Sequence, residues 1–122
     1  MLTLDEFIQA APAGKILKNQ YVKHPDFSGI YVRYNEQRYI NGEMVSNVLD
    51  IANITARKPG KGAFSKLIVD LRQKHPLLVF YVECILNPRF ADKLERMGFT
   101  YNKVGENYTD SMYLLPNQEL KE

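Results

Sequence analysis

The chain has few of the residues that build disulfide-bonded, zinc-binding or membrane-spanning proteins. It contains one cysteine, Cys84, and two histidines among 122 residues, so no internal disulfide can form and no cluster has zinc-ligand spacing. No stretch approaches the roughly 18 consecutive apolar residues of a membrane span, and the N-terminus, Met1 to Glu6, lacks the basic and then apolar layout of a signal peptide. We therefore expect a soluble cytoplasmic protein without a structural metal, folded as one domain, residues 1–122.

The chain also has little net charge. Sixteen basic and fourteen acidic residues give a net charge of +2, which is too small to indicate nucleic-acid binding from composition alone. The basic residues nevertheless gather between Arg57 and Lys74. A bound phosphate group would explain the part of this cluster nearest two glycines, whereas a solvated helix face explains Lys66, Arg72 and Lys74 equally well.

A glycine-bearing turn stands in the middle of the chain, Arg57-Lys58-Pro59-Gly60-Lys61-Gly62, and an apolar helical pattern follows it. Two glycines one residue apart let a backbone approach a ligand closely, and the start of the next helix presents unpaired N–H groups. The turn therefore predicts a phosphate site. It fits neither common phosphate motif. Ser65 stands where a dinucleotide fingerprint needs a third glycine, and Gly62 follows Lys61 where a nucleotide loop needs Ser or Thr.

The rest of the chain shows strand and helix patterns of ordinary length. Thr3 and Glu6 form a capping box that opens a short helix, and Asn41-Gly42 is a strong hairpin signal. The expected elements, in chain order, are helix 3–10, strands 29–34, 37–40 and 45–55, helix 62–74, strand 77–85, helix 89–97, strands 99–104 and 108–115, and a polar, frayed tail 116–122.

The central elements form a strand, glycine turn, helix and strand in succession, which predicts a right-handed crossover between parallel neighbours. The strand 77–85 is nearly all apolar, as expected when both faces are buried. In the strand 45–55, simple alternation separates two sets of side chains. One face should carry Leu49, Ile51 and Asn53, and the other Val48, Asp50, Ala52 and Ile54.

A second segment follows the crossover: Asn87, then Ala91 and Leu94, then Gly98-Phe99. Together with the Arg-x-x-Gly-x-Gly turn, it resembles the GCN5-related N-acetyltransferase (GNAT) superfamily, over about Val45 to Leu115. The resemblance implies a variable N-terminal substrate region over 1–44, an acyl-CoA-binding core over 45–115 and a tail over 116–122. It also implies an α/β (α+β) fold with a mixed, mostly antiparallel sheet, a central parallel pair splayed around the crossover, and helices on both faces.

The resemblance further implies acetyl-CoA, or another acyl-CoA, as cosubstrate, bound where the strand ending near Thr55 parts from the strand ending near Cys84. Backbone amides of the turn would hold the pyrophosphate, and Asn87 would contact the pantetheine arm; a helix N-cap explains Asn87 as well. The implied activity is transfer of acetyl to a primary amine by direct attack in a ternary complex. The implied cofactor-binding residues are Ile54, Thr55, Arg57, Lys58, Gly60, Lys61, Gly62, Ala63 and Asn87.

Catalytic residues are less clearly marked. In the family a tyrosine on the helix after the asparagine often protonates the departing thiolate, and that position, counted back from Gly98-Phe99, is Leu94 here. Substitutes for this acid are the three tyrosines of the final hairpin and Cys84, although a lone buried cysteine is more often core filling. The three tyrosines are Tyr101, Tyr108 and Tyr113.

A general base would help, because deprotonating an amine of pKa about 10.4 at pH 7 costs about 4 to 5 kcal/mol. The first candidate is Glu83, a carboxylate in an apolar strand, where desolvation would raise its pKa. An ion pair with Arg57 or Arg89 is the alternative explanation for Glu83. Asp50 is the second candidate base, and an amide nitrogen within 52–55 would polarise the thioester carbonyl.

Two other functions stay open. Leu94 in the tyrosine position is compatible with a non-catalytic GNAT-like module that binds CoA or another protein. Alternating tyrosines and arginines between Tyr31 and Tyr39 are compatible with a nucleic-acid-associated protein that stacks bases, although such residues are more often those of an amphipathic strand. The amine acceptor, small molecule or protein, and a homodimer are likewise left open; no membrane partner is expected.

Overall fold

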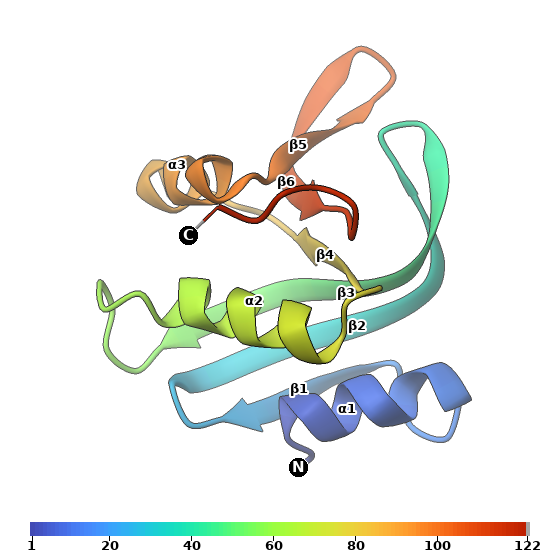
Figure 1. Cartoon of the computed structure of the whole chain (residues 1–122), viewed down its shortest axis with the longest axis vertical. Helices are drawn as coiled ribbons and strands as arrows, with labels where there is room; N and C mark the ends of the chain where they lie inside the picture. The colour runs from blue at the N-terminus through green and yellow to red at the C-terminus, as the bar shows by residue number, and fades with distance from the viewer. Residues whose placement is uncertain (122) are drawn as a thin grey trace.

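The computed structural model of the chain describes residues 1–121 and shows three α-helices and a six-stranded sheet (Figure 1). The elements are α1 (Leu4–Ala10), a 3-10 helix η1 (Ala11–Ala13), β1 (Asn19–His24), β2 (Phe27–Ile40), β3 (Glu43–Ala56), α2 (Ala63–Lys74), β4 (Val79–Val82), α3 (Pro88–Met97), β5 (Thr100–Val104) and β6 (Asn107–Leu114). The strand order is β1-β2-β3-β4-β6-β5. Among the six strands found within residues 1–121, only β3 and β4 pair in parallel, which confirms the expected mixed, mostly antiparallel sheet.

Local signals place most of the boundaries. Thr3 caps α1 through both bonds of the capping box, and Asn87 caps α3 with proline at the first helical position. Asn41 and Gly42 both have positive φ, 53° and 81°, as a two-residue hairpin turn requires. The two short strands expected before this turn form one strand, β2, because the pairing with β3 continues through both.

All three α-helices pack on the same face of the sheet. The main core contains Phe7 of α1, Ile68 of α2 and Leu94 of α3, each fully buried. Direct contacts also join neighbouring helices: Lys74 of α2 lies 3.2 Å from Asp5 of α1, and Ser65 of α2 hydrogen-bonds to Met97 of α3. The expected helices on both faces are therefore not found within residues 1–121.

Part of the opposite face is covered by the end of the long β2–β3 hairpin, which bends toward β5 and β6 (Figure 1). The backbone N–H of Asn41 at its tip donates to Oδ1 of Asn102 at 2.7 Å, and Nδ2 of Asn102 donates to the Tyr81 hydroxyl at 2.9 Å. A second buried cluster lies under the hairpin, consisting of Ile40, Val48, Val79, Tyr81 and Tyr113. The curl of the sheet thus buries side chains that no helix covers.

A β-bulge interrupts β3. Tyr31 pairs with Asn53 and Val32 pairs with Ile51, so Ala52 has no partner on β2. The extra residue reverses the alternation beyond it, because side chains alternate with a period of two. Ile54 therefore packs against the main core rather than sharing the face of Asp50, and the simple alternation expected for this strand is wrong after Ala52.

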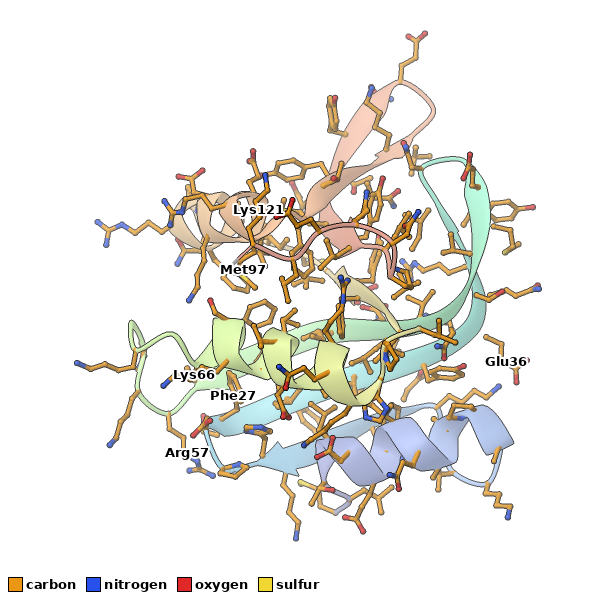
Figure 2. The ribbon with its side chains drawn as sticks, viewed as in Figure 1. Phe27, Glu36, Arg57, Lys66, Met97 and Lys121 are labelled. Carbon is orange, nitrogen blue, oxygen red and sulfur yellow. The ribbon has the colours of Figure 1, made fainter. Side chains whose placement is uncertain are left out.

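The C-terminal segment 116–121 is held against the core and is not frayed as expected; Glu122 lies outside the described residues. Arg72 donates to the carbonyls of Gln118 and Leu115 at 2.8 and 3.0 Å. The Lys121 N–H donates to the Met97 carbonyl at 2.9 Å, and Figure 2 shows these two residues side by side. No helix within residues 1–121 is long and apolar enough to cross a membrane.

Candidate functional site

The parallel strands β3 and β4 part after a short run of pairs. Pairing extends from Val48 with Val79 to Ile51 with Val82, and the Glu83 N–H then donates to the Ile51 carbonyl at 3.1 Å. Beyond this point β3 continues to Ala56, paired with β2 only. The chain after β4 turns at Cys84, whose φ is 51°, so this strand ends at Val82 and not near Ile85 as expected. The β3 edge from Ala52 to Ala56 therefore has no strand partner on the β4 side within residues 1–121.

A cavity of about 180 Å³ occupies this gap. It is lined by residues 51–54 of β3, residues 82–87 and Phe90. Three predicted site residues, Ile54, Glu83 and Asn87, thus lie together. The Asn87 Oδ1 accepts the Arg89 N–H at 2.9 Å, so this residue caps α3 and lines the gap at once.

The glycine turn forms a second cavity, of about 340 Å³, at the start of α2. Gly60 and Gly62 have φ of 78° and 74°, a region that favours glycine, and Gly62 caps α2 without a side-chain hydrogen bond to its first turn. The lining residues are Pro25, Asp26, Arg57, Lys58, Lys61, Ala63 and Lys66. Figure 2 shows Arg57 and Lys66 at the same end of the molecule. Four predicted phosphate residues, Arg57, Lys58, Lys61 and Ala63, thus line this cavity. Gly60, Gly62 and Thr55 line neither cavity.

The turn is anchored to the β1–β2 connection by Arg57. Its backbone N–H donates to the Asp26 carbonyl and its side-chain Nε donates to the Pro25 carbonyl, both at 3.0 Å. The predicted ion pair between Glu83 and Arg57 or Arg89 is wrong, because Glu83 lies beside two arginines of β2 instead.

Asp50 and Glu83 form a carboxylate pair with Arg33 and Arg38 on the hairpin-covered face. Arg33 Nη1 lies 2.5 Å from Glu83 Oε2 and 3.9 Å from Asp50 Oδ2. Arg38 Nη1 lies 3.1 Å from Asp50 Oδ2, its Nη2 lies 3.8 Å from Glu83 Oε1, and its guanidinium stacks on the Tyr81 ring at 4.0 Å. Asp50 is fully buried, and its Oδ1 has no hydrogen-bond partner.

This environment raises the pKa of Asp50 to about 7, chiefly through burial and then through the charge and hydrogen bond of Glu83, while Arg38 and Arg33 oppose the rise. Asp50, the second of the two candidate bases, is thus the carboxyl group whose pKa is raised. The sequence favours Glu83 because it stands in an otherwise apolar strand, whereas nothing in the sequence of β3 indicates that a hairpin covers Asp50.

No motif in the sequence marks Arg33 or Arg38 as site residues, although the hairpin turn does predict the position of Arg33. A two-residue turn at Asn41-Gly42 fixes the register that places Arg33 opposite Asp50. Both arginines of the Tyr31 to Tyr39 strand therefore have carboxylate partners.

The three candidate tyrosines do not line the gap, whereas Cys84 does. Tyr101 and Tyr108 line a different cavity, with Asp110, and Tyr113 lies in the cluster under the hairpin, where burial chiefly raises its pKa. None of the residues that line the gap within 1–121 is a tyrosine. Leu94 is fully buried in the main core, and Cys84 is exposed and lines the gap.

No group of three or more His, Cys, Asp or Glu side chains within residues 1–121 is arranged to hold a metal ion. No protein-family model, no curated protein and no solved structure matches the chain. Function is therefore inferred from the geometry and chemistry of the site.

Proposed function

We propose that the protein is a cytoplasmic GNAT-like N-acyltransferase, which transfers acetyl from acetyl-CoA to a primary amine of a small molecule or a protein. The observation that carries the proposal is the gap between β3 and β4, which leads along an open strand edge to the basic turn at the start of α2. This arrangement suits a long cosubstrate with a reactive thioester at one end and a diphosphate near the other.

The open edge of β3 offers backbone partners to the arm of such a cosubstrate. Unpaired N–H and C=O groups of an edge strand bind extended amide-containing ligands as an added strand would. From Ala52 to Arg57 the strand spans about 17 Å, at about 3.3 Å per residue. A pantetheine arm, which contains two amides, would lie along this edge between the gap and the turn.

The turn supplies the anion site. The N–H groups in the first turn of α2 have no side-chain cap, and they lie at the positive end of the helix dipole. Arg57, Lys58, Lys61 and Lys66 add positive charge around the same cavity. These groups together would hold the diphosphate and 3′-phosphate region of the cosubstrate.

The carboxylate pair supplies the base. Glu83 lines the gap, so it takes the proton that the amine loses as its nitrogen bonds to the acyl carbon and the carbon–sulfur bond breaks. Asp50 lies beside Glu83 and shares that proton, because its pKa is close to neutral pH. Among residues 1–121, no lining residue of the gap is a tyrosine, so the departing thiolate takes a proton from water or from Cys84, the candidate acid that lines the gap.

A non-catalytic CoA-binding or protein-interaction module is the second candidate. It is favoured by Leu94, which is buried in the core at the position where the family often has its tyrosine acid. It is also favoured by the ion pair between Arg33 and Glu83, which occupies the candidate base.

Calorimetric titration with acetyl-CoA tests both functions, and product formation from a panel of amines separates them. Binding followed by acetylated product supports the acyltransferase, and Glu83→Gln should then lower the rate at neutral pH while binding is retained. Binding without product from any amine selects the module. Absence of binding at millimolar acetyl-CoA would exclude both.

A further inference from the structure

A fourth cavity, of about 580 Å³, lies between α1, the end of β1 and α2, away from the β3–β4 gap. Its volume falls within the roughly 300 to 1,000 Å³ of small-molecule sites. No predicted motif is centred on it, although Arg57 at its border belongs to the glycine turn. It shares only Pro25 and Arg57 with the cavity of the glycine turn.

The base of this cavity is apolar. Leu67 and Leu71 of α2 and Leu4 of α1 line it, and all three are buried. Leu67 and Leu71 are one helical turn apart, so they form a continuous stripe on one face of α2. Because these leucines are already nearly buried, an aliphatic chain laid over the stripe would mainly remove its own apolar surface from water.

The polar groups that line the cavity are of two kinds: Lys74, Asp5 and Asp70 neutralise one another, whereas Lys23, His24 and Arg57 have no carboxylate within 4 Å among residues 1–121. Lys74 lies 3.2 Å from Asp5 and 3.0 Å from Asp70, so these three charges satisfy one another. Arg57 uses Nε to bond the Pro25 carbonyl, and no carboxylate within residues 1–121 lies within 4 Å of its guanidinium. His24 accepts the Asp26 N–H through Nδ1 at 3.1 Å, so the neutral ring carries its proton on Nε2 and acts there as a donor.

We propose that this cavity binds an amphipathic monocarboxylate, with its carboxylate on Arg57 and His24 and its aliphatic chain on Leu67 and Leu71. The terminal guanidinium nitrogens of Arg57 match a carboxylate in a two-pronged geometry. A cationic amphiphile fits less well, because Lys74 already neutralises Asp5 and Asp70. The site is separate from the β3–β4 gap but shares Arg57 with the proposed anion site. Octanoate binding to the free chain does not depend on whether the protein binds acetyl-CoA.

Sodium octanoate is the probe, titrated into the full chain by calorimetry and by ¹H–¹⁵N correlation NMR. Octanoate should bind and shift the amide signals of Leu67, Leu71 and Arg57. Shorter acids should bind more weakly, by about threefold to fourfold for each methylene removed. Octanol, which has the chain without the charge, and acetate, which has the charge without the chain, should both bind much more weakly than octanoate.

Two matched variants test the carboxylate contact. Arg57→Gln should weaken octanoate binding by about tenfold or more, the loss expected for a charge-assisted hydrogen bond. Lys66→Gln removes a nearby cation that does not line this cavity and should leave octanoate affinity unchanged. Urea unfolding of both variants confirms that each is folded.

Three results would overturn the proposal. The first is no octanoate binding at millimolar concentration by the folded wild-type chain. The second is equal affinity for octanol and octanoate, which would show an apolar groove without anion recognition. The third is an equal loss of octanoate affinity in Arg57→Gln and Lys66→Gln, which would show a general effect of positive charge.

Discussion

Asp50 and Glu83 share their arginine partners across the parallel strands: Arg38 lies 3.1 Å from the carboxylate of Asp50 and 3.8 Å from that of Glu83. Arg33 contacts both carboxylates as well. The cluster is formally neutral when both acids are ionised. Because the pKa of Asp50 is raised to about 7, the pair gains a proton near neutral pH, and its charge changes in the range where a base for amine chemistry must work.

The raised pKa of Asp50 predicts that the free energy of unfolding falls as pH increases. The ordinary value is 3.8 and the folded value about 7, so between these pH values the folded chain holds a proton that the unfolded chain has lost. Stability from this group is full below about pH 4 and is lost as pH rises through 7. At about 1.4 kcal/mol per pH unit, the loss is at most about 4 kcal/mol. Urea unfolding at a series of pH values from 4 to 8 measures it.

Asp50→Asn should flatten this dependence, because the amide does not titrate and no longer repels Glu83. The matched control is Asp92→Asn, which changes an exposed carboxylate on α3 and should keep the wild-type slope. If Asp50→Asn keeps the full wild-type slope, other groups cause it, and the proton-sharing role of Asp50 is wrong.

Alanine substitutions in the glycine turn should leave the protein folded but weaken its binding of phosphate groups. A Cβ at Gly60 or Gly62 meets nothing within 4 Å, so each substitution costs only the roughly 1 to 2 kcal/mol of a left-handed alanine. The same Cβ would project where a diphosphate approaches the backbone. We expect the double variant Gly60→Ala, Gly62→Ala to bind acetyl-CoA at least about tenfold more weakly by calorimetry.

Gly105→Ala is the control for backbone strain. Gly105 also has positive φ, 63°, and open space around its Cβ, but it lies in the β5–β6 turn. It should lose a similar amount of stability per site and no affinity for acetyl-CoA. Unchanged affinity in the Gly60, Gly62 double variant would remove the turn from the proposed site.

Gly98→Ala should destabilise the fold more than Gly105→Ala. Gly98 has φ of 108°, and a Cβ there would lie 2.5 Å from the carbonyl oxygen of Glu119. The segment 116–121 must then move, which disturbs the bond from Lys121 to the Met97 carbonyl. We expect a loss of more than about 2 kcal/mol by urea unfolding. Equal losses at Gly98 and Gly105 would show that the C-terminal segment contributes little to stability.

Local chemistry explains which parts of the fold the sequence predicts well. The capping box of Thr3, the turn at Asn41-Gly42 and the cap at Asn87 act within a few residues, so each is visible in the sequence and each is found in the structure. The parallel crossover follows in the same way from the order of strand, turn, helix and strand. The catalytic role of these elements stays a prediction.

Features that depend on distant segments are the ones the sequence does not show. The bulge at Ala52 arises from pairing with β2, and alternation within β3 gives no sign of it. The burial of Asp50 and the ion pair of Arg33 with Glu83 depend on how the β2–β3 hairpin bends over the sheet. The C-terminal segment looks polar, yet it is held by the carbonyl contacts of Arg72 on α2.

Asn102 links the hairpin to the environment of Asp50, and its loss should change both stability and pKa. Its side chain accepts the Asn41 N–H and donates to the Tyr81 hydroxyl, and the residue is buried. Asn102→Ala leaves these two groups without partners, at a cost of about 1 to 3 kcal/mol for each that stays buried. Release of the hairpin tip would let water reach Asp50, and because burial is the main cause of its raised pKa, that pKa should fall.

Carbon-13 NMR titration of the Asp50 carboxyl measures this shift directly. Thr109→Val is the matched control, because Thr109 also makes two hydrogen bonds, to the Asn102 carbonyl and from the Ser111 N–H, but neither reaches the β2–β3 hairpin. We expect Thr109→Val to lose stability while Asp50 titrates as in the wild type. If Asp50 titrates as in the wild type in folded Asn102→Ala, the hairpin stays closed without the two hydrogen bonds of the Asn102 side chain. The burial of Asp50 would then be set by the strands of the sheet themselves.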